Sequence, residues 1–369
     1  MTGSQTDPRE TARRDFLAEA GWGAAHVDPF PGDASTRRYF RVTLDGRPAV
    51  LMDAPAGTEA PACPPTADAE TRARLGYNAM ARLAGNNTAA FAGLAKALSA
   101  RGFSAPKIYE ADVEHGLLLI EDLGDDLFAR VVPDRAHEGA LYAQAVETLA
   151  ALYRSSFERE PEAFGARWLV QDYDPLALQA EADLFMDWYA ARRGEGEPTQ
   201  GLYADWRSAW AAVLPALHSH AQGLVLRDFH AENLIWLPDR QAEARTGLLD
   251  FQDALFGHPA YDLVSLIEDA RRDVSPHIAK PLCDRFFEAA GLDDREAFDA
   301  AYAVLAAQRN AKILGIFVRL VERDGKTRYG QFMSRVARHF VKDLDHPALA
   351  PVRAVVREAA PQVYAEADR

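Results

Sequence analysis

The segment from residue 223 to residue 250 constrains the fold of this chain more than any other. It contains three short apolar runs, GLVLRD, NLIWLP and TGLLDF, which are separated by polar turns. Short apolar runs between turns predict short strands, whereas much of the second half of the chain has apolar residues at helical spacing. We therefore expect a group of short strands inside a mostly helical part of the protein.

A carboxylate or an amide stands at or beside the end of these runs, in the order Asp228, Asn233 and Asp250. Carboxylates usually seek water, so their position next to apolar strands predicts a cleft that holds a ligand. Carboxylate and amide oxygens suit Mg²⁺, which keeps several waters and bridges phosphates, better than they suit zinc. Each residue alone could cap a helix or a turn. The joint order D-x₄-N-x₁₆-D, with apolar strands before and between, is harder to obtain from capping.

The first part of the chain is richer in strand signals. At 369 residues the chain is too long for one ordinary core, so we expect two lobes. The dipeptide Asp45-Gly46 lies between β-forming stretches and predicts a hairpin of two antiparallel strands. Residues 54–70 are rich in Pro and Ala without a clear period, which predicts a loop. A helix is expected at about 87–101.

The stretch HGLLLIEDLGDD predicts a strand that ends in a linker, because its apolar run is followed by acidic residues and glycine. We therefore predict an α+β fold with a strand-rich lobe at 1–120, a hinge at 121–126 and a larger helical lobe at 127–369. Apolar residues at helical spacing in the second lobe are Tyr142, Val146, Leu149 and Tyr153 in one segment, and Leu178, Phe185, Trp188 and Tyr189 in another.

The composition favours a folded protein of the cytoplasm, with 48% apolar and 26% charged residues. No apolar stretch has the length of a membrane span, and the N-terminus lacks the apolar core of a secretory signal. Cys63 and Cys283 are too few for a disulfide framework or a thiolate metal site. A formal charge of −14 would repel a nucleic-acid backbone. We expect no nucleic-acid, membrane or obligate protein partner, while a local cation or metal could still hold a phosphorylated small molecule.

The sequence LRDFHAENLIWL…GLLDFQD resembles the catalytic and metal-binding segments of the aminoglycoside phosphotransferase and choline kinase family, which is related to the protein kinases. The resemblance implies that Asp228 orients and deprotonates the acceptor hydroxyl, and that Asn233 and Asp250 hold Mg²⁺ on the phosphates of ATP. It also implies that backbone groups of about Glu121 to Leu123 hold the adenine edge. A bilobal fold with a small antiparallel sheet follows from the same resemblance.

A narrower resemblance is carried by DASTRRYFRV, VLMDAP and LRDFHAENLIWLP. These segments are similar to those of bacterial anomeric kinases of N-acetylmuramate and N-acetylglucosamine. This resemblance implies ATP-dependent phosphorylation of the C1 hydroxyl of an amino sugar during peptidoglycan recycling. The segment GHPAYDLVSLIED also resembles the family, and its Asp262 is expected to have a structural role in the first turn of a helix.

The sequence departs from the family pattern on the strand PAVLMDAP. Leu51, Met52 and Asp53 stand where the family's phosphate-binding lysine is expected. The turn before the preceding strand offers Arg37 and Arg38, and we predict that they meet the phosphate charge instead, because a guanidinium can bind phosphate oxygens with two donors. The alternative for each arginine is a solvated charge on a sheet edge.

Three further residues are candidate substrate contacts, each with a structural alternative. His230 follows the candidate catalytic Asp by two residues and could contact the substrate or the backbone of its own turn. Glu181 shares a helix face with Phe185 and Trp188, where core packing is the alternative to a sugar contact. Arg309 lies among apolar residues on one helical face, so its guanidinium needs a partner, either a structural carboxylate, which we favour, or a ligand.

Other functions fit parts of this pattern. A kinase of this kind could act on an aminoglycoside or on a choline-like alcohol. The missing lysine favours a nucleotide-binding pseudokinase, although a scaffold would not need the Asp, Asn and Asp set. A metallohydrolase without ATP could use a transition metal on Asp228, His230, Asp250, Asp253 and His258.

Overall fold

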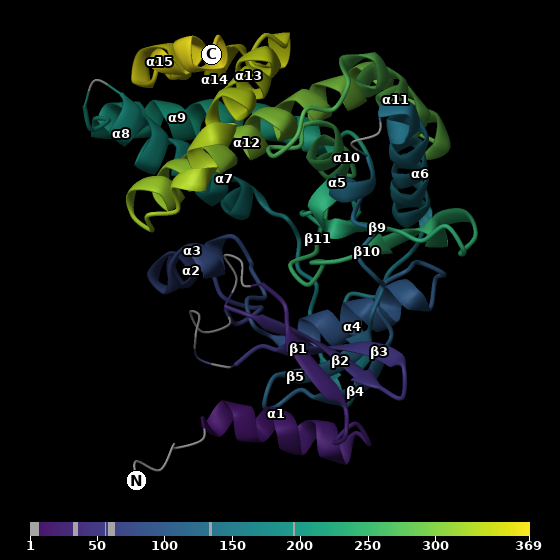
Figure 1. Ribbon diagram of the computed structural model, residues 1–369. Coiled ribbons are helices and arrows are strands. Elements are labelled where there is room, and N and C mark those ends of the chain that lie inside the picture. The colour runs from purple at the N-terminus through teal and green to yellow at the C-terminus, as the bar shows by residue number, and fades with distance from the viewer. Residues whose placement is uncertain (1–6, 32–35, 56, 58–62, 133–134, 195) are drawn as a thin grey trace.

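Five strands in the first third of the chain form one antiparallel sheet, in the order β1-β2-β3-β5-β4. The computed structural model describes residues 7–31, 36–55, 57, 63–132, 135–194 and 196–369. The strands of the sheet are β1 (His26–Pro29), β2 (Arg38–Leu44), β3 (Arg47–Asp53), β4 (Ile108–Asp112) and β5 (Leu117–Glu121). Figure 1 shows this sheet below a larger body of helices. The predicted combination of a strand-rich lobe and a larger helical lobe is confirmed.

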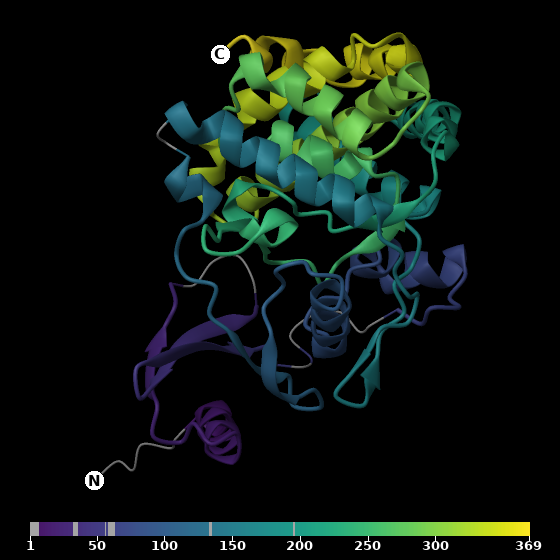
Figure 2. The same ribbon diagram turned by 90° about the vertical axis from the view of Figure 1, so that its right-hand side faces the viewer.

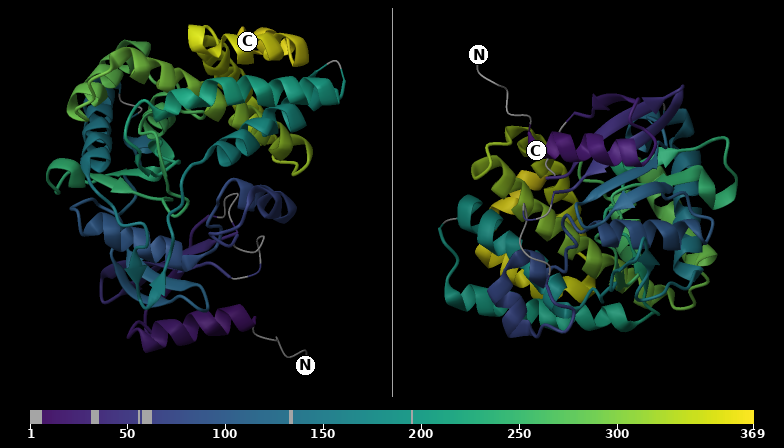
Figure 3. Two further views of the ribbon diagram at one scale, coloured as in Figure 1. Left: turned by 180° about the vertical axis from the view of Figure 1, so that it is seen from behind. Right: turned by 90° about the horizontal axis from the view of Figure 1, so that it is seen from below.

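The other elements are mostly helical. The α-helices are α1 (Pro8–Glu19), α2 (Ala69–Leu75), α3 (Tyr77–Met80), α4 (Thr88–Ser99), α5 (Phe128–Val131), α6 (Arg135–Arg154), α7 (Pro175–Leu184), α8 (Ala191–Arg193), α9 (Gln200–Val213), α10 (Ala260–Ile267), α11 (Pro276–Ala289), α12 (Arg295–Glu322), α13 (Met333–Asp343), α14 (Ala350–Ala359) and α15 (Gln362–Ala367). The π and 3₁₀ segments are η1 (Phe185–Ala190), η2 (Leu214–His218), η3 (Ala231–Asn233), η4 (Ala242–Arg245), η5 (Thr327–Phe332) and η6 (Pro347–Leu349). Figure 3 shows α13, α14 and α15 at the end of the helical lobe that is far from the sheet.

The Asp45-Gly46 dipeptide forms the predicted hairpin turn between β2 and β3. Both residues have positive φ angles, 50° for Asp45 and 75° for Gly46, as a type I′ turn requires. The loop predicted for 54–70 follows β3. Its residues 56 and 58–62 lie outside the described part of the chain, and its last two residues already belong to α2.

The central strand β3 is apolar on both faces because helices cover both faces of the sheet. Leu51 belongs to a small core that includes Phe16 and Leu17 of α1, whereas Val50 and Met52 belong to the main core together with residues of α4. The helix α4 confirms the prediction for 87–101, and Asn87 caps it by accepting from the backbone N–H of Ala89.

Each lobe sends a segment across to the other. From the first lobe, Arg72 of α2 reaches the start of α7. Its Nη1 donates to Oδ2 of Asp174 at 2.6 Å. In the opposite direction, the hairpin of β6 (Glu162–Ala163) and β7 (Ala166–Arg167) lies against α4 (Figure 2), where Lys96 donates to the backbone oxygen of Glu162 at 3.0 Å. The division of the chain at residues 121–126 stays a prediction, although β5 ends at Glu121, the first residue of that range.

The short strands predicted between residues 223 and 250 are confirmed. The strand β9 (Leu234–Trp236) pairs antiparallel with β10 (Thr246–Leu248). The strand β8 (Gly223–Val225) pairs antiparallel with β11 (Leu255–Gly257), a strand that the sequence did not predict. These two pairs lie between the sheet and the long helices (Figure 1), and residues that follow β8 and β10 line a cavity together with residues of the sheet.

The regular helix predicted for the segment after Leu178 is corrected at Phe185, where α7 passes into the π-helical segment η1. Phe185 stacks on Tyr189 with ring centroids 5.1 Å apart. The helix α12 packs tightly here, since a Cβ added at Gly315 would collide with the carbonyl of Leu184. Within the described ranges, no helix has both the length and the apolar character needed to cross a membrane.

Candidate active site

A buried carboxylate fixes the loop of residues 226–233, called here the Asp228 loop, which follows β8. Asp262, in the first turn of α10, accepts from the backbone N–H of Leu226 at 2.6 Å and from that of Arg227 at 2.8 Å. Arg227 has a φ of 73°, a strained value for a residue with a side chain. Asp262 therefore has the structural role expected for it, because its two hydrogen bonds hold the strained turn that presents Asp228.

Asp228 is half-buried and lies in a positive field. Burial acts to raise its pKa, but the charges of neighbouring basic groups outweigh burial, and the pKa is lowered. The carboxylate is therefore ionised near neutral pH, and it can accept a hydrogen bond or a proton from a hydroxyl group. The groups that lower the pKa are, in order of effect, His230, Lys312, Arg227 and Arg309.

Asn233 closes the Asp228 loop and lines the cleft. Its Nδ2 donates to the backbone oxygen of Asp228 at 3.0 Å, so its Oδ1 is the atom left for a cation. Asp250 follows β10 with a φ of 56°, a strained backbone position like that of Arg227. Its carboxylate accepts from Gln252 Nε2 at 2.8 Å and also lines the cleft. One amide oxygen and one carboxylate fit the needs of Mg²⁺, which takes few protein ligands together with phosphate oxygens.

Of the two candidate phosphate-binding arginines, only Arg37 reaches this place. Its Nη2 donates to Oδ1 of Asp250 at 2.9 Å, and its side chain is largely buried in the cleft wall. Arg38 is the exposed first residue of β2 and does not line the cavity beside Asp250. Both arginines line another pocket together with Asp53, so they differ in that only Arg37 also lines the cavity beside Asp250.

The missing lysine leaves an apolar surface on β3. Val50 lines the cavity of the cleft, and Met52 is buried beside it in the main core. Asp53 points the other way and accepts from Arg9 at 2.6 Å and from Arg13 at 2.7 Å, both on α1. The Asp53 carboxylate therefore does not compete for the site of the phosphates.

A cavity of about 360 Å³ lies between the sheet, the predicted hinge and the short strands. Glu121 and Leu123 line it, as do apolar residues on both sides and, at one end, Asn233 and Asp250. The carboxylate of Glu121 is held by Arg240 at 2.7 Å, so the backbone of this segment is what the cavity offers to a ligand. A slot with apolar walls and a polar backbone edge suits a planar base. The apolar walls include Val50, Phe91, Ile120, Ile235 and Leu249.

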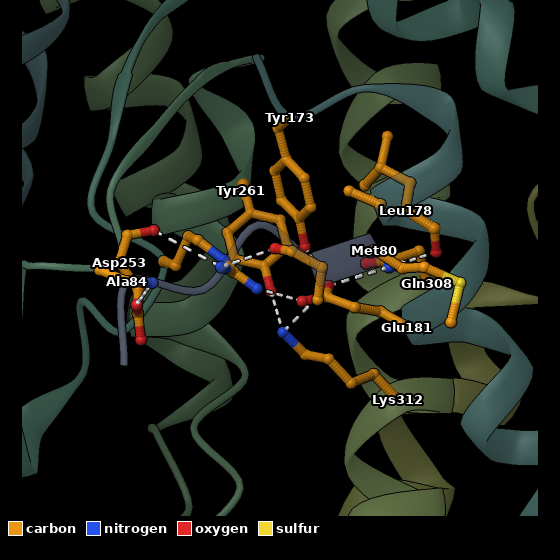
Figure 4. Close-up of polar contacts among 12 residues, drawn as sticks. Met80, Ala84, Tyr173, Leu178, Glu181, Asp253, Tyr261, Gln308 and Lys312 are labelled. Atoms are coloured by element: carbon orange, nitrogen blue, oxygen red, sulfur yellow. Dashed lines mark hydrogen bonds and ion pairs between the residues drawn. The ribbon is translucent and has the colours of Figure 1, made fainter. Parts of the chain in front are cut away.

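Glu181 lies behind the Asp228 loop, fully buried on α7 (Figure 4). Its carboxylate contacts the guanidinium of Arg227, the hydroxyl of Tyr173 and, at 3.3 Å, Nζ of Lys312. Burial acts to raise the pKa of Glu181, but Arg227 and Lys312 outweigh it and keep the carboxylate ionised. These contacts are those of the structural alternative, because the carboxylate itself is fully buried among protein groups.

Arg309 and His230 are also buried. Arg309 donates to Oγ of Ser265 at 2.9 Å and to the backbone oxygen of Glu268 at 3.4 Å. No carboxylate in the described ranges forms an ion pair with it, so neutral oxygens take the place of the carboxylate favoured from the sequence. His230 contacts Nη1 of Arg271 through its Nε2 at 3.2 Å, and burial lowers its pKa. A substrate role for these two residues stays a prediction.

Sequence reasoning missed Lys312 and Arg227 as parts of this site. Lys312 lies one helical turn after Arg309 on α12 and donates to the hydroxyl of Tyr261 at 2.5 Å. Its position on the face of Arg309 could have pointed to it. Arg227 precedes Asp228 directly, and a charged residue after three apolar ones in LVLRD was the available signal.

The residues of the hydrolase alternative are held by separate partners. Asp253 accepts from the backbone N–H of Ala84 at 2.6 Å. His258 packs on Phe298 and contacts His220 at 3.3 Å between ring nitrogens. Across the part of the chain that the structure describes, no three His, Cys, Asp or Glu side chains form a group that could hold a metal ion.

The sequence of the chain is similar to those of bacterial proteins that are named as kinases. An N-acetylmuramate/N-acetylglucosamine kinase of Caulobacter vibrioides is 42% identical over 346 residues, which cover 94% of this chain and 95% of that protein. A protein of the same name from Neisseria meningitidis serogroup B is 30% identical over 344 residues, 88% of each chain. One from Pseudomonas aeruginosa is 31% identical over 324 residues, 85% of this chain and 83% of that protein.

Solved structures share the fold. A choline kinase of Streptococcus pneumoniae superposes with a TM-score of 0.54 at 14% identity, over 90% of this chain and 99% of that one. A thermostable aminoglycoside phosphotransferase in a ternary complex with AMP-PNP and hygromycin B has a TM-score of 0.54 at 12% identity, over 94% and 98% of the two chains. The bilobal, protein-kinase-like fold implied by the sequence motif is confirmed.

A family model described as the phosphotransferase enzyme family matches residues 26–300, which include the sheet, the predicted hinge and the Asp228 loop. The match therefore covers every element that builds the cleft. Together with the relative that is 42% identical along nearly the whole chain, this match shows that the chain belongs to the phosphotransferase enzyme family.

Proposed function

We propose that the chain is an ATP- and Mg²⁺-dependent kinase of a cell-wall amino sugar. Its acceptor is the anomeric C1 hydroxyl of N-acetylmuramate, N-acetylglucosamine or both, and its products are the sugar 1-phosphate and ADP. The names of the bacterial relatives at 30 to 42% identity support this acceptor class. The observation that carries the proposal is that Asn233 and Asp250 line a cavity suited to a nucleotide, and that Asn233 is hydrogen bonded to the backbone oxygen of Asp228.

Each part of the cleft has a task in this proposal. The base of ATP lies in the apolar slot against the segment from Glu121 to Leu123, with its phosphates directed toward Asn233 and Asp250. These two residues would hold Mg²⁺, which supplies positive charge for the phosphate oxygens. Arg37, whose guanidinium already lies on Asp250, binds phosphate oxygens once the carboxylate has a metal partner.

Asp228 receives the proton of the acceptor hydroxyl. The hydroxyl oxygen attacks the γ-phosphorus, the bond from that phosphorus to the bridging oxygen breaks, and ADP leaves with the electron pair. Because the pKa of Asp228 is lowered, the carboxylate is a weak base that acts mainly by orienting the hydroxyl. Such positioning is the main requirement of phosphoryl transfer.

Release of ADP tests the acceptor class. With ATP and Mg²⁺, N-acetylmuramate or N-acetylglucosamine should stimulate ADP formation, whereas choline and hygromycin B, added at the same concentration, should not. If only choline or the aminoglycoside stimulated ADP formation, the acceptor class of this proposal would be wrong. A purified protein that binds ATP but forms no ADP with any of these compounds would point to the pseudokinase alternative. A cytoplasmic location, a role in peptidoglycan recycling and activity without a protein partner belong to the same proposal.

A further inference from the structure

A second cavity lies beside the Asp228 loop. Its volume is about 400 Å³, and its charged lining comes from Glu232 in the loop and from residues 269–273, which follow α10. Glu232 also lines the nucleotide cavity, so the two cavities share a wall at the Asp228 loop. A group bound in the second cavity would therefore lie against the loop that carries Asp228.

Two of the charged residues in this lining are already neutralised by the protein. Arg272 donates to Oε1 of Glu138 at 3.2 Å. Asp273 accepts from Arg335 at 2.7 and 2.9 Å. Neither pair needs a ligand, so the recognition chemistry of the cavity comes from the remaining residues.

Asp269 has hydrogen-bonding capacity that the protein does not use. Its side chain is almost fully buried, at 1% exposure. Oδ1 accepts from the backbone N–H of Arg271 at 2.8 Å, whereas the buried Oδ2 has no donor among the described residues. An unsatisfied buried carboxylate oxygen is costly. A ligand that presents a hydroxyl or an amide N–H would supply the missing donor.

Arg271 has unused hydrogen-bond donors, whereas Asp269 has an unused acceptor. Its Nη1 lies 3.2 Å from Nε2 of His230, a neutral partner, and no carboxylate within the described ranges forms an ion pair with it. The backbone N–H of His230 donates to the backbone oxygen of Asp228 at 3.1 Å, so Arg271 is one residue removed from the candidate catalytic group. A guanidinium in this position has donors left for an anion, and its planar fork fits a carboxylate.

We infer that this cavity is the acceptor subsite, in which Arg271 binds a carboxylate of the sugar and Asp269 accepts from a sugar hydroxyl or acetamido N–H. The inference rests on the proposed function and adds a source of specificity to it. N-acetylmuramate carries a lactyl carboxylate that N-acetylglucosamine lacks. Arg271 is therefore the residue that makes the enzyme favour the acidic sugar, while Asp269 serves both sugars.

Steady-state kinetics of Arg271→Gln with both sugars tests this inference. The variant should lower kcat/KM for N-acetylmuramate about tenfold or more, the scale of one charge-assisted contact, and should leave kcat/KM for N-acetylglucosamine within about twofold. Arg271→Lys should recover part of the loss. The control is Arg285→Gln, which removes an exposed guanidinium paired with Glu147 on the same lobe and should change neither value.

The amide of the lactyl group gives a second readout. For the wild-type enzyme, kcat/KM should be lower with this amide than with N-acetylmuramate, by the same factor that Arg271→Gln lowers kcat/KM for N-acetylmuramate. In Arg271→Gln, kcat/KM should be the same for the amide and for the acid. Asp269→Asn should raise KM for both sugars alike. If Arg271→Gln left the ratio of kcat/KM for N-acetylmuramate to kcat/KM for N-acetylglucosamine unchanged, the inference would be overturned while the kinase proposal stayed intact. A wild-type protein that phosphorylates neither sugar would overturn both.

Discussion

Nη2 of Arg37 donates to Oδ1 of Asp250 at 2.9 Å, across the cleft between the two lobes. The pair joins the turn before β2 to the residue that would hold the metal ion. It places a guanidinium where the strand lysine of related enzymes is missing, since β3 presents Val50 and Met52 to this side. The protein thus has a cation at the proposed phosphate site, although it comes from a different element than the strand on which the lysine was expected.

Replacing Arg37 should slow phosphoryl transfer more than it weakens ATP binding. The charge on the transferring group is felt more strongly in the transition state than in the ground state, so Arg37→Ala should lower kcat by about tenfold or more, the scale of a charge-assisted contact. Arg38→Ala removes the neighbouring guanidinium, which does not line the cavity beside Asp250, and as the matched control it should leave kcat within about twofold. Steady-state kinetics with an acetylated amino sugar distinguish the two. Wild-type kcat in Arg37→Ala would move the phosphate contact to another cation.

Removing the carboxylate of Asp250 should make the affinity for ATP independent of Mg²⁺. Wild-type protein should bind ATP more tightly with Mg²⁺ than without it, because the ion bridges carboxylate and phosphates. In Asp250→Ala the two affinities should become equal, and in Asn233→Ala the difference should shrink less. Isothermal titration calorimetry with and without Mg²⁺ measures these affinities. An unchanged magnesium effect in Asp250→Ala would contradict the metal assignment.

Glu181→Gln separates a structural from a substrate role for the buried carboxylate. The substitution leaves Arg227 and Lys312 buried with less negative charge, so the free energy of unfolding should fall by about 3 kcal/mol. Glu162→Gln, which breaks an exposed pair with Arg167, should cost less than about 1 kcal/mol. Urea unfolding gives both values. Retained stability together with a raised KM for the sugar would instead indicate a substrate contact.

Acid should destabilise the protein through His258. Burial, reinforced by His220, lowers the pKa of His258 to about 3 in the folded chain, against about 6.5 when unfolded. The unfolded chain therefore binds the proton more tightly, and stability is lost as the pH falls below 6.5, by about 1.4 kcal/mol at pH 5.5. His258→Asn keeps an acceptor for the N–H of Ala260 and should flatten this slope. Urea unfolding at pH 5.5 and 7.5 measures the change in the free energy of unfolding. An equal change in the wild-type protein and in His258→Asn would contradict this assignment.

Much of the fold could be predicted from local patterns in the sequence. The Asp45-Gly46 turn, the short strands and the polar residues at their ends each depend on neighbours within a few positions, which a single sequence displays. The motif around Asp228 then linked these pieces to a family. The strand β11 was missed because its residues Leu255 to Gly257 form a run too short to stand out from the following turn.

Contacts between distant positions could not be predicted in the same way. Glu181 meets Arg227 and Lys312 only because three separate elements pack behind the Asp228 loop. The contact between Arg37 and Asp250 joins positions 213 residues apart, and no local pattern shows that Arg37 makes it and Arg38 does not. Arg271 drew no attention in the sequence, since its significance comes from its contact with His230, 41 residues away.

Phosphorus NMR of the products formed from ATP and N-acetylmuramate or N-acetylglucosamine shows which hydroxyl of the sugar receives the phosphate. We expect a phosphomonoester signal coupled to the anomeric proton, formed in equal amount with ADP. Asp228→Asn should bind ATP normally and form this product at least about a hundredfold more slowly, because the amide cannot receive the proton of the hydroxyl. A phosphate coupled to another position of the sugar, ADP without sugar phosphate, or near-normal turnover by Asp228→Asn would show that the proposed reaction or the role of Asp228 is wrong.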